Sequence, residues 1–225
     1  MKEERVSEEH ESESGSNSNY NGDVQESELW DRISTTDGVE RAEVLAELSH
    51  FAYKRDDDAE CIQLCETSID LYKKSAPNTH LHELIHLHEG KALSLRNLEQ
   101  HSEAAATFEE IAQLQKERDE ISGYIQAIRA AGCEWYAAKE WLKSYHAHKA
   151  AQDAVDPDAT DFSMGVDSIN MGMALNKLER VSEAIPNFLA ARKSVGIARG
   201  QAVSKQPRVH RELGMKMGVT PERLL

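Results

Sequence analysis

The chain has 225 residues, of which 40% are apolar and 29% charged, and its formal net charge is −14. This composition is typical of a globular protein with polar extensions, and an acidic chain is unsuited to binding along a phosphate backbone. No stretch approaches the roughly 20 apolar residues of a membrane span, and three cysteines do not indicate a disulfide framework. We therefore expect a cytoplasmic protein with reduced thiols, with neither a membrane nor a nucleic acid as its partner.

The N-terminal segment, residues 1–28, is rich in Glu, Ser, Asn and Gly. Residues 1–31 contain ten acidic and two basic side chains. Such a segment cannot bury enough apolar surface to offset its chain entropy, so we expect an acidic disordered tail. The first apolar cluster is Leu29, Trp30 and Ile33, which we expect to dock onto the helices that follow.

Apolar stripes at helical spacing fill residues 29–200, which we expect to form one helical repeat domain. Prolines at Pro77 and Pro157 separate some of the helices, because proline cannot continue the helical hydrogen-bond ladder. The pattern predicts four antiparallel hairpins, which pair residues 38–54 with 57–75, 80–97 with 101–117, 119–137 with 140–154, and 161–178 with 182–200.

Residues 201–225 break this pattern. A short helix is predicted after Pro207, with Val209, Leu213 and Met217 on one face. Residues 199–225 hold six basic and two acidic side chains. We expect a capping helix and a basic C-terminal tail, since a stack of repeats needs an end with one polar side.

The hairpins repeat one another. A set of small or packing residues recurs at offsets of 0, 12, 16 and 19, with 40 residues between the later copies. The members are Ala92, Ala104, Phe108 and Ile111; Gly132, Ser144, His148 and Ala151; Gly172, Ala184, Phe188 and Ala191; and, in a looser copy, Ser49, Cys61, Cys65 and Ser68. Such a period indicates a solenoid of stacked hairpins, three or four in number. Cys61 and Cys65, which are four residues apart, are interpreted as small buried packing residues rather than as half of a metal site.

These offsets resemble the tetratricopeptide repeat (TPR) in a long variety of about 40 residues. The string MGMALNKLERVSEAIPNFLAA, residues 171–191, is the best copy. The resemblance implies an all-α, right-handed superhelix that acts as a non-enzymatic scaffold. Its partner would be a peptide or a helix of another protein, held in the concave groove without a cofactor. Self-association through the ends of the solenoid is an alternative use of the repeats.

The resemblance also implies which side chains line the groove. Carried over to this sequence, they are Tyr53, Lys54, His86, Arg96, Asn97, Gln126, Arg129, Tyr136, Asn176 and Lys177. We expect Arg96, Arg129 and Lys177 to bind an acidic ligand and Tyr136 to supply an apolar anchor. Because these side chains would point away from the hairpin core, we expect their removal to have little effect on folding.

One motif favours an enzyme instead. His82-Glu83-Leu84-Ile85-His86 matches H-E-x-x-H, in which two imidazoles one turn apart bind Zn²⁺ and the glutamate acts as general base. A zinc-dependent hydrolase is therefore the alternative function. It requires a third ligand, for which the sequence offers Glu103, Glu109 and Glu110 without distinguishing among them.

Overall fold

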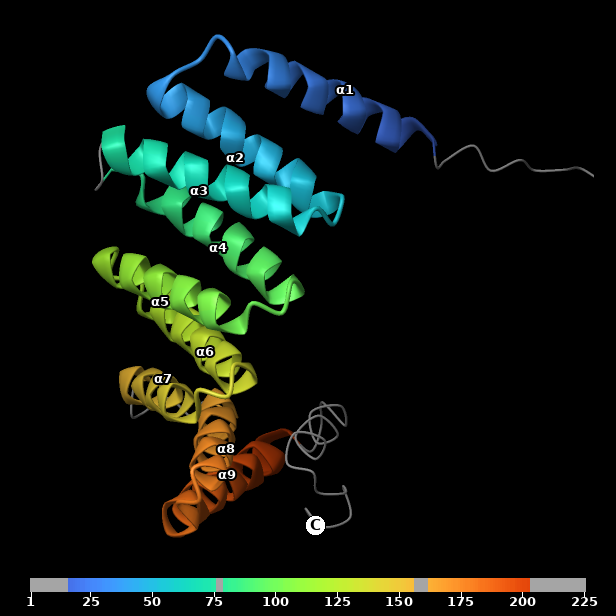
Figure 1. The fold of residues 1–225 in the computed structure, drawn as a ribbon. Helices are drawn as coiled ribbons and strands as arrows, with labels where there is room; N and C mark the ends of the chain where they lie inside the picture. Colours follow the sequence, from blue (N-terminus) through green and yellow to red (C-terminus); the bar gives the residue numbers. More distant parts are fainter. Residues whose placement is uncertain (1–15, 76–78, 156–161, 203–225) are drawn as a thin grey trace, which may run out of the picture.

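The computed structural model describes residues 16–75, 79–155 and 162–202, and over these residues it is all-helical. The nine helices in this part of the chain are α1 (Ser16–Ile33), α2 (Gly38–Lys54), α3 (Asp58–Ser75), α4 (Leu81–Asn97), α5 (His101–Glu117), α6 (Ile121–Ala137), α7 (Trp141–Ala154), α8 (Phe162–Lys177) and α9 (Val181–Ala202). Consecutive helices pack against one another, so that the hairpins stack in chain order (Figure 1). The fold predicted from the 40-residue repeat is confirmed, with four hairpins from α2 to α9.

Tight turns of one kind connect the two helices of a hairpin. In the turn between α4 and α5, Glu99 has a φ of 59°, and Asp56, Lys139 and Glu179 take the same left-handed conformation in the other hairpins. The amide of Gln100 donates to the carbonyl of Leu95 at 2.9 Å, and the amide of Glu99 donates to that of Arg96 at 2.9 Å. This is the Schellman arrangement, which satisfies the last carbonyls of a helix.

The repeated small residues lie where the two helices of a hairpin cross. A Cβ added to Gly132 would lie 2.7 Å from Nε2 of His148, and one added to Gly172 would lie 2.7 Å from Cε1 of Phe188. The residues at offsets 0 and 16 of the repeat therefore contact each other in both hairpins. In the looser copy, Ser49, Cys61, Cys65 and Ser68 are also buried, which makes the first hairpin part of the same packing scheme.

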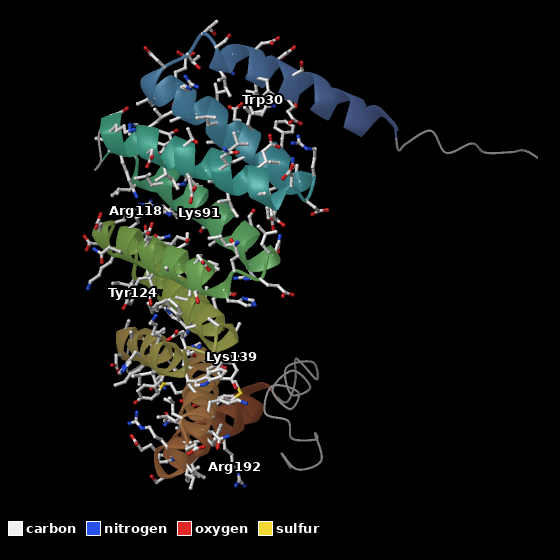
Figure 2. The ribbon with its side chains drawn as sticks, in the orientation of Figure 1. Trp30, Lys91, Arg118, Tyr124, Lys139 and Arg192 are labelled. Carbon is white, nitrogen blue, oxygen red and sulfur yellow. The ribbon has the colours of Figure 1, made fainter. Side chains whose placement is uncertain are left out.

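The N-terminal segment differs from expectation, because α1 begins at Ser16, within the predicted tail. Leu29 is buried in the core of the first hairpin and Ile33 packs against it, whereas Trp30 is 43% exposed on α1 (Figure 2). Because these contacts fix the C-terminal end of α1, extending this helix toward the N-terminus costs less free energy than nucleating a new helix. Residues 1–15 and the predicted capping helix lie outside the described residues.

Candidate functional site

The predicted groove residues come from the first helix of each hairpin, α2, α4, α6 and α8. Most of them reach solvent. The exposed side chains are Lys54, His86, Asn97, Gln126, Asn176 and Lys177, and the partly exposed ones are Tyr53, Arg96, Arg129 and Tyr136. Many of these residues lie in the last turn of their helix, next to the turn that leads to the second helix. The structure therefore places part of the predicted set along one edge of the stack.

Arg96 is held by the next hairpin. Its Nε donates to Oε1 of Glu134 on α6 at 2.7 Å, and its guanidinium lies 5.2 Å from the centre of the Phe108 ring. Nδ1 of His101 donates to the other oxygen of Glu134 at 2.8 Å. Glu134 is only 6% exposed, so the two donors compensate a carboxylate that burial would otherwise destabilise.

Arg129 makes a similar contact one junction further along. Its Nε and Nη2 donate to Oδ2 of Asp167 on α8 at 2.8 and 2.6 Å, and Nδ1 of His148 on α7 donates to Oδ1 at 3.2 Å. Asp167 is completely buried. Burial lowers the pKa of His148, but its hydrogen bonds with Asp167 and Cys133 outweigh this effect and raise the pKa overall. The charged form of this histidine is therefore favoured beside the carboxylate.

These two ion pairs change the roles expected of the arginines. Both arginines are bound to carboxylates of the following hairpin, instead of pointing as unpaired cations toward a ligand. Glu134 and Asp167 were not among the predicted site residues. A usable signal existed, because each arginine precedes its acidic partner by 38 residues, close to one repeat length.

An aromatic cluster lies at the α6–α7 turn, where Figure 2 labels Lys139. The rings of Tyr136 and Trp141 meet edge to face with their centres 4.8 Å apart. Nζ of Lys177 lies 5.8 Å from the centre of the Trp141 ring, within the range of a cation–π contact. Three successive helices, α6, α7 and α8, thus contribute one aromatic and cationic patch, which includes two predicted groove residues.

The remaining predicted residues make fewer contacts with other side chains of the protein. Nδ2 of Asn97 donates to Oδ1 of Asp58 at 3.1 Å, which joins α4 to α3. Nζ of Lys54 lies 5.9 Å from the centre of the Phe51 ring on the same helix, and Tyr53 packs against the core of the first hairpin.

The H-E-x-x-H segment lies on the surface of α4. The Nε2 atoms of His82 and His86 are 3.2 Å apart, and Nδ1 of His86 donates to Oε2 of Glu89 at 3.1 Å. Among the described residues, no three His, Cys, Asp or Glu side chains are grouped closely enough to hold a metal ion. Two of the expected third ligands have other contacts. Oε1 of Glu109 accepts a hydrogen bond from Nε1 of Trp135, and Oε2 of Glu110 lies 3.2 Å from Nδ1 of His88.

The two cysteines of α3, which lie one helical turn apart, are packing residues, as predicted. Cys61 and Cys65 are each 1% exposed and free. The hydrogen bond with Cys61, together with burial, raises the pKa of the Cys65 thiol. A buried thiol with a raised pKa is unreactive, which agrees with a structural role for Cys65.

Comparisons with known proteins identify the fold but no family. No protein-family model matches the chain, and no curated protein matches it. The solved structure of apo RapI matches with a TM-score of 0.61 at 13% identity, over 90% of this chain and 71% of that chain. BtubC (BKLC) from P. vanneervenii matches with a TM-score of 0.59 at 11% identity, over 85% and 78% of the two chains.

A third solved structure, aspartyl phosphate phosphatase F from Bacillus subtilis, matches with a TM-score of 0.53 at 12% identity, over 83% of this chain and 50% of that chain. At these identities the likeness establishes the shared helical fold, and a shared fold does not assign an activity. Within the described ranges, none of the helices combines the length and apolar character needed to cross a membrane.

Proposed function

We propose that this chain is a non-enzymatic scaffold of the long-repeat TPR type that binds a peptide or a partner helix in the groove formed by α2, α4, α6 and α8. The observation that carries the proposal is the row of exposed or half-exposed side chains at equivalent positions of successive first helices. Repeat stacks present such rows as extended binding surfaces. The chain's net charge of −14 favours a protein ligand over a nucleic acid, and its free cysteines suit a reducing cytoplasm.

Recognition is centred on the patch of Tyr136, Trp141 and Lys177. Two aromatic rings held edge to face provide a rigid apolar surface, and Lys177 adds a cation beside it. Aromatic residues are frequent energetic anchors of interfaces because they bury a large area at little entropic cost. Arg96 and Arg129 contribute by fixing the relative position of neighbouring hairpins, since their charges are already paired.

The test begins with selection of ligands from a random peptide library displayed on phage, with the full chain as bait. Binding of the selected synthetic peptides is then measured by fluorescence anisotropy. Tyr136→Ala and Lys177→Ala should each weaken binding by about tenfold or more, as is typical of interface anchors. Lys116→Ala, an exposed lysine on the second helix α5, is the matched control and should bind normally.

Glu83→Gln separates the scaffold from the hydrolase. If α4 serves only as a helix of the repeat, this variant should bind the selected peptides as the unmodified chain does. The proposal fails if the peptides bind equally well to the Tyr136→Ala, Lys177→Ala and Lys116→Ala variants. It also fails if the chain hydrolyses peptides and loses this activity in Glu83→Gln.

A further inference from the structure

The last described helix has an uncovered apolar stripe. Val181, Ile185 and Leu189 are 52%, 52% and 59% exposed and follow one another at intervals of four residues on α9. Side chains at this spacing lie on one face of a helix. Three large apolar side chains in a row form a contiguous surface, in contrast to the single exposed apolar residues that are common on proteins.

The equivalent face of α5 receives the next hairpin. Two repeat lengths before the stripe, the equivalent residues are His101, Ala105 and Glu109. His101 and Glu109 form hydrogen bonds with Glu134 and Trp135 of α6, and Ala105 is completely buried. The three positions therefore face the first helix of the following hairpin.

The junction between the third and fourth hairpins has a similar contact at the first of these positions. Trp141 of α7, one repeat length before Val181, faces Lys177 of α8. Nε2 of Gln152, near the end of α7, donates to Oγ of Ser168 on α8 at 2.9 Å. The stripe on α9 thus corresponds to positions of α5 and α7 that include contacts with the following hairpin, although Lys149, the residue of α7 that corresponds to Leu189, pairs with Asp153 on its own helix. In Figure 2, Arg192 marks α9 at the end of the stack.

We propose that residues 203–225 of the same chain cover this stripe and close the end of the stack, with Val209, Leu213 and Met217 as the contacting side chains. These three residues have the same four-residue spacing as the stripe. Pro207 precedes them, and proline is well tolerated in the first turn of a helix. The segment is basic, whereas the chain as a whole carries a net charge of −14, so its attraction to the acidic repeats is favourable.

The length of the segment permits this contact within one molecule. Leu189 lies 13 residues before Ala202, which is about 20 Å along a helix. The seven residues from 203 to 209 span up to about 25 Å when extended, which is enough for Val209 to reach Leu189. A short tether also gives the segment an effective concentration on the order of millimolar at the stripe, which favours it over a second copy of the chain.

Site-specific photo-cross-linking of the full chain tests the proposal. The photoreactive amino acid p-benzoylphenylalanine replaces Ile185, and the cross-linked peptides are identified by mass spectrometry. We expect a product of monomer size in which position 185 is joined to residues 203–225. The matched control replaces Ala190, an exposed residue on another face of α9, and should give little of this product. A product of dimer size, a cross-link to another segment, no cross-link, or equal yields from both positions would overturn the proposal.

A second pair of variants tests the contacting side chains. Leu213→Glu, introduced into the photoreactive chain, should reduce the yield of the cross-link roughly tenfold or more, because it would place an unpaired carboxylate against an apolar surface. Arg211→Glu changes a residue two positions away, on another face of a helix, and should retain the cross-link. Equal losses in the two variants would overturn the assignment of Leu213. Far-ultraviolet circular dichroism verifies that each variant is folded. The outcome is independent of the proposed groove, whose peptide binding is measured separately.

Discussion

Replacement of Arg129 by alanine tests whether the junction between the third and fourth hairpins depends on a buried ion pair. The change removes both hydrogen bonds to Oδ2 of Asp167, a side chain with no exposed surface. His148 remains as a donor to the other oxygen. Loss of one partner of a buried pair typically costs 3–5 kcal/mol, because the remaining charge is left uncompensated, so we expect a loss of about 3–5 kcal/mol.

Urea unfolding followed by circular dichroism measures this loss directly. For a chain of this size, each kcal/mol corresponds to roughly 2–4 °C, so the melting temperature should fall by about 6–20 °C. Arg180→Ala is the matched control, because Arg180, the residue before α9, forms an exposed pair with Glu183 in the first turn of that helix, and its removal should leave the melting temperature nearly unchanged. A loss below about 1 kcal/mol for Arg129→Ala would show that the buried carboxylate of Asp167 does not need this guanidinium to compensate its charge.

Three further changes test a turn between two helices, a helix crossing and a buried histidine. Glu179→Gly should stabilise the chain by about 1 kcal/mol in urea unfolding, because Glu179 has a φ of 60°, whereas Glu179→Ala should not. Gly132→Ala should destabilise the chain by about 1–3 kcal/mol in the same assay, because the new Cβ would meet the ring of His148. This loss should exceed the gain from the better helix propensity of alanine. A variant as stable as the unmodified chain, or more stable, would contradict the tight crossing of the two helices. Burial, with two nearby lysines, lowers the pKa of His88 to about 4, so the unfolded chain binds the proton more readily and stability should fall as the pH drops from about 6.5 to 4. The Glu110 carboxylate, 3.2 Å from Nδ1 of His88, opposes this shift and limits the loss to at most about 3 kcal/mol. His88→Ile should reduce this acid-dependent loss of stability. If the free energy of unfolding changes between pH 7 and pH 4 by the same amount in the variant as in the unmodified chain, His88 is not the group responsible.

The sequence was most informative about the helices, because their packing is local and periodic. Small residues at fixed offsets predicted the contact of Gly132 with His148 and that of Gly172 with Phe188. The start of α1 at Ser16 was not predicted, since its composition is that of a disordered segment and its end is fixed by tertiary contacts of Leu29. Periodicity carries no information about contacts that occur once.

The candidate site was harder to predict for the same reason. The ring of Trp141, which was not among the predicted groove residues, lies close to both Tyr136 and Lys177, which were. The pairing of Arg96 and Arg129 was not predicted, because the two arginine–carboxylate pairs occupy different repeat positions and share only their 38-residue separation. A side chain's place in a repeat predicts its direction, whereas its partner depends on the neighbouring hairpin.

The internal pairing of the arginines also changes the kind of ligand that the groove favours. With Arg96 and Arg129 neutralised by Glu134 and Asp167, the cations left along the predicted groove are few, and Lys177 is already close to an aromatic ring. An interaction carried mainly by unpaired surface charges would weaken steeply with added salt, whereas burial of aromatic surface would not. A groove with paired arginines and an aromatic patch therefore favours a ligand with an apolar anchor, whose acidic groups add to recognition near Lys177 without dominating it.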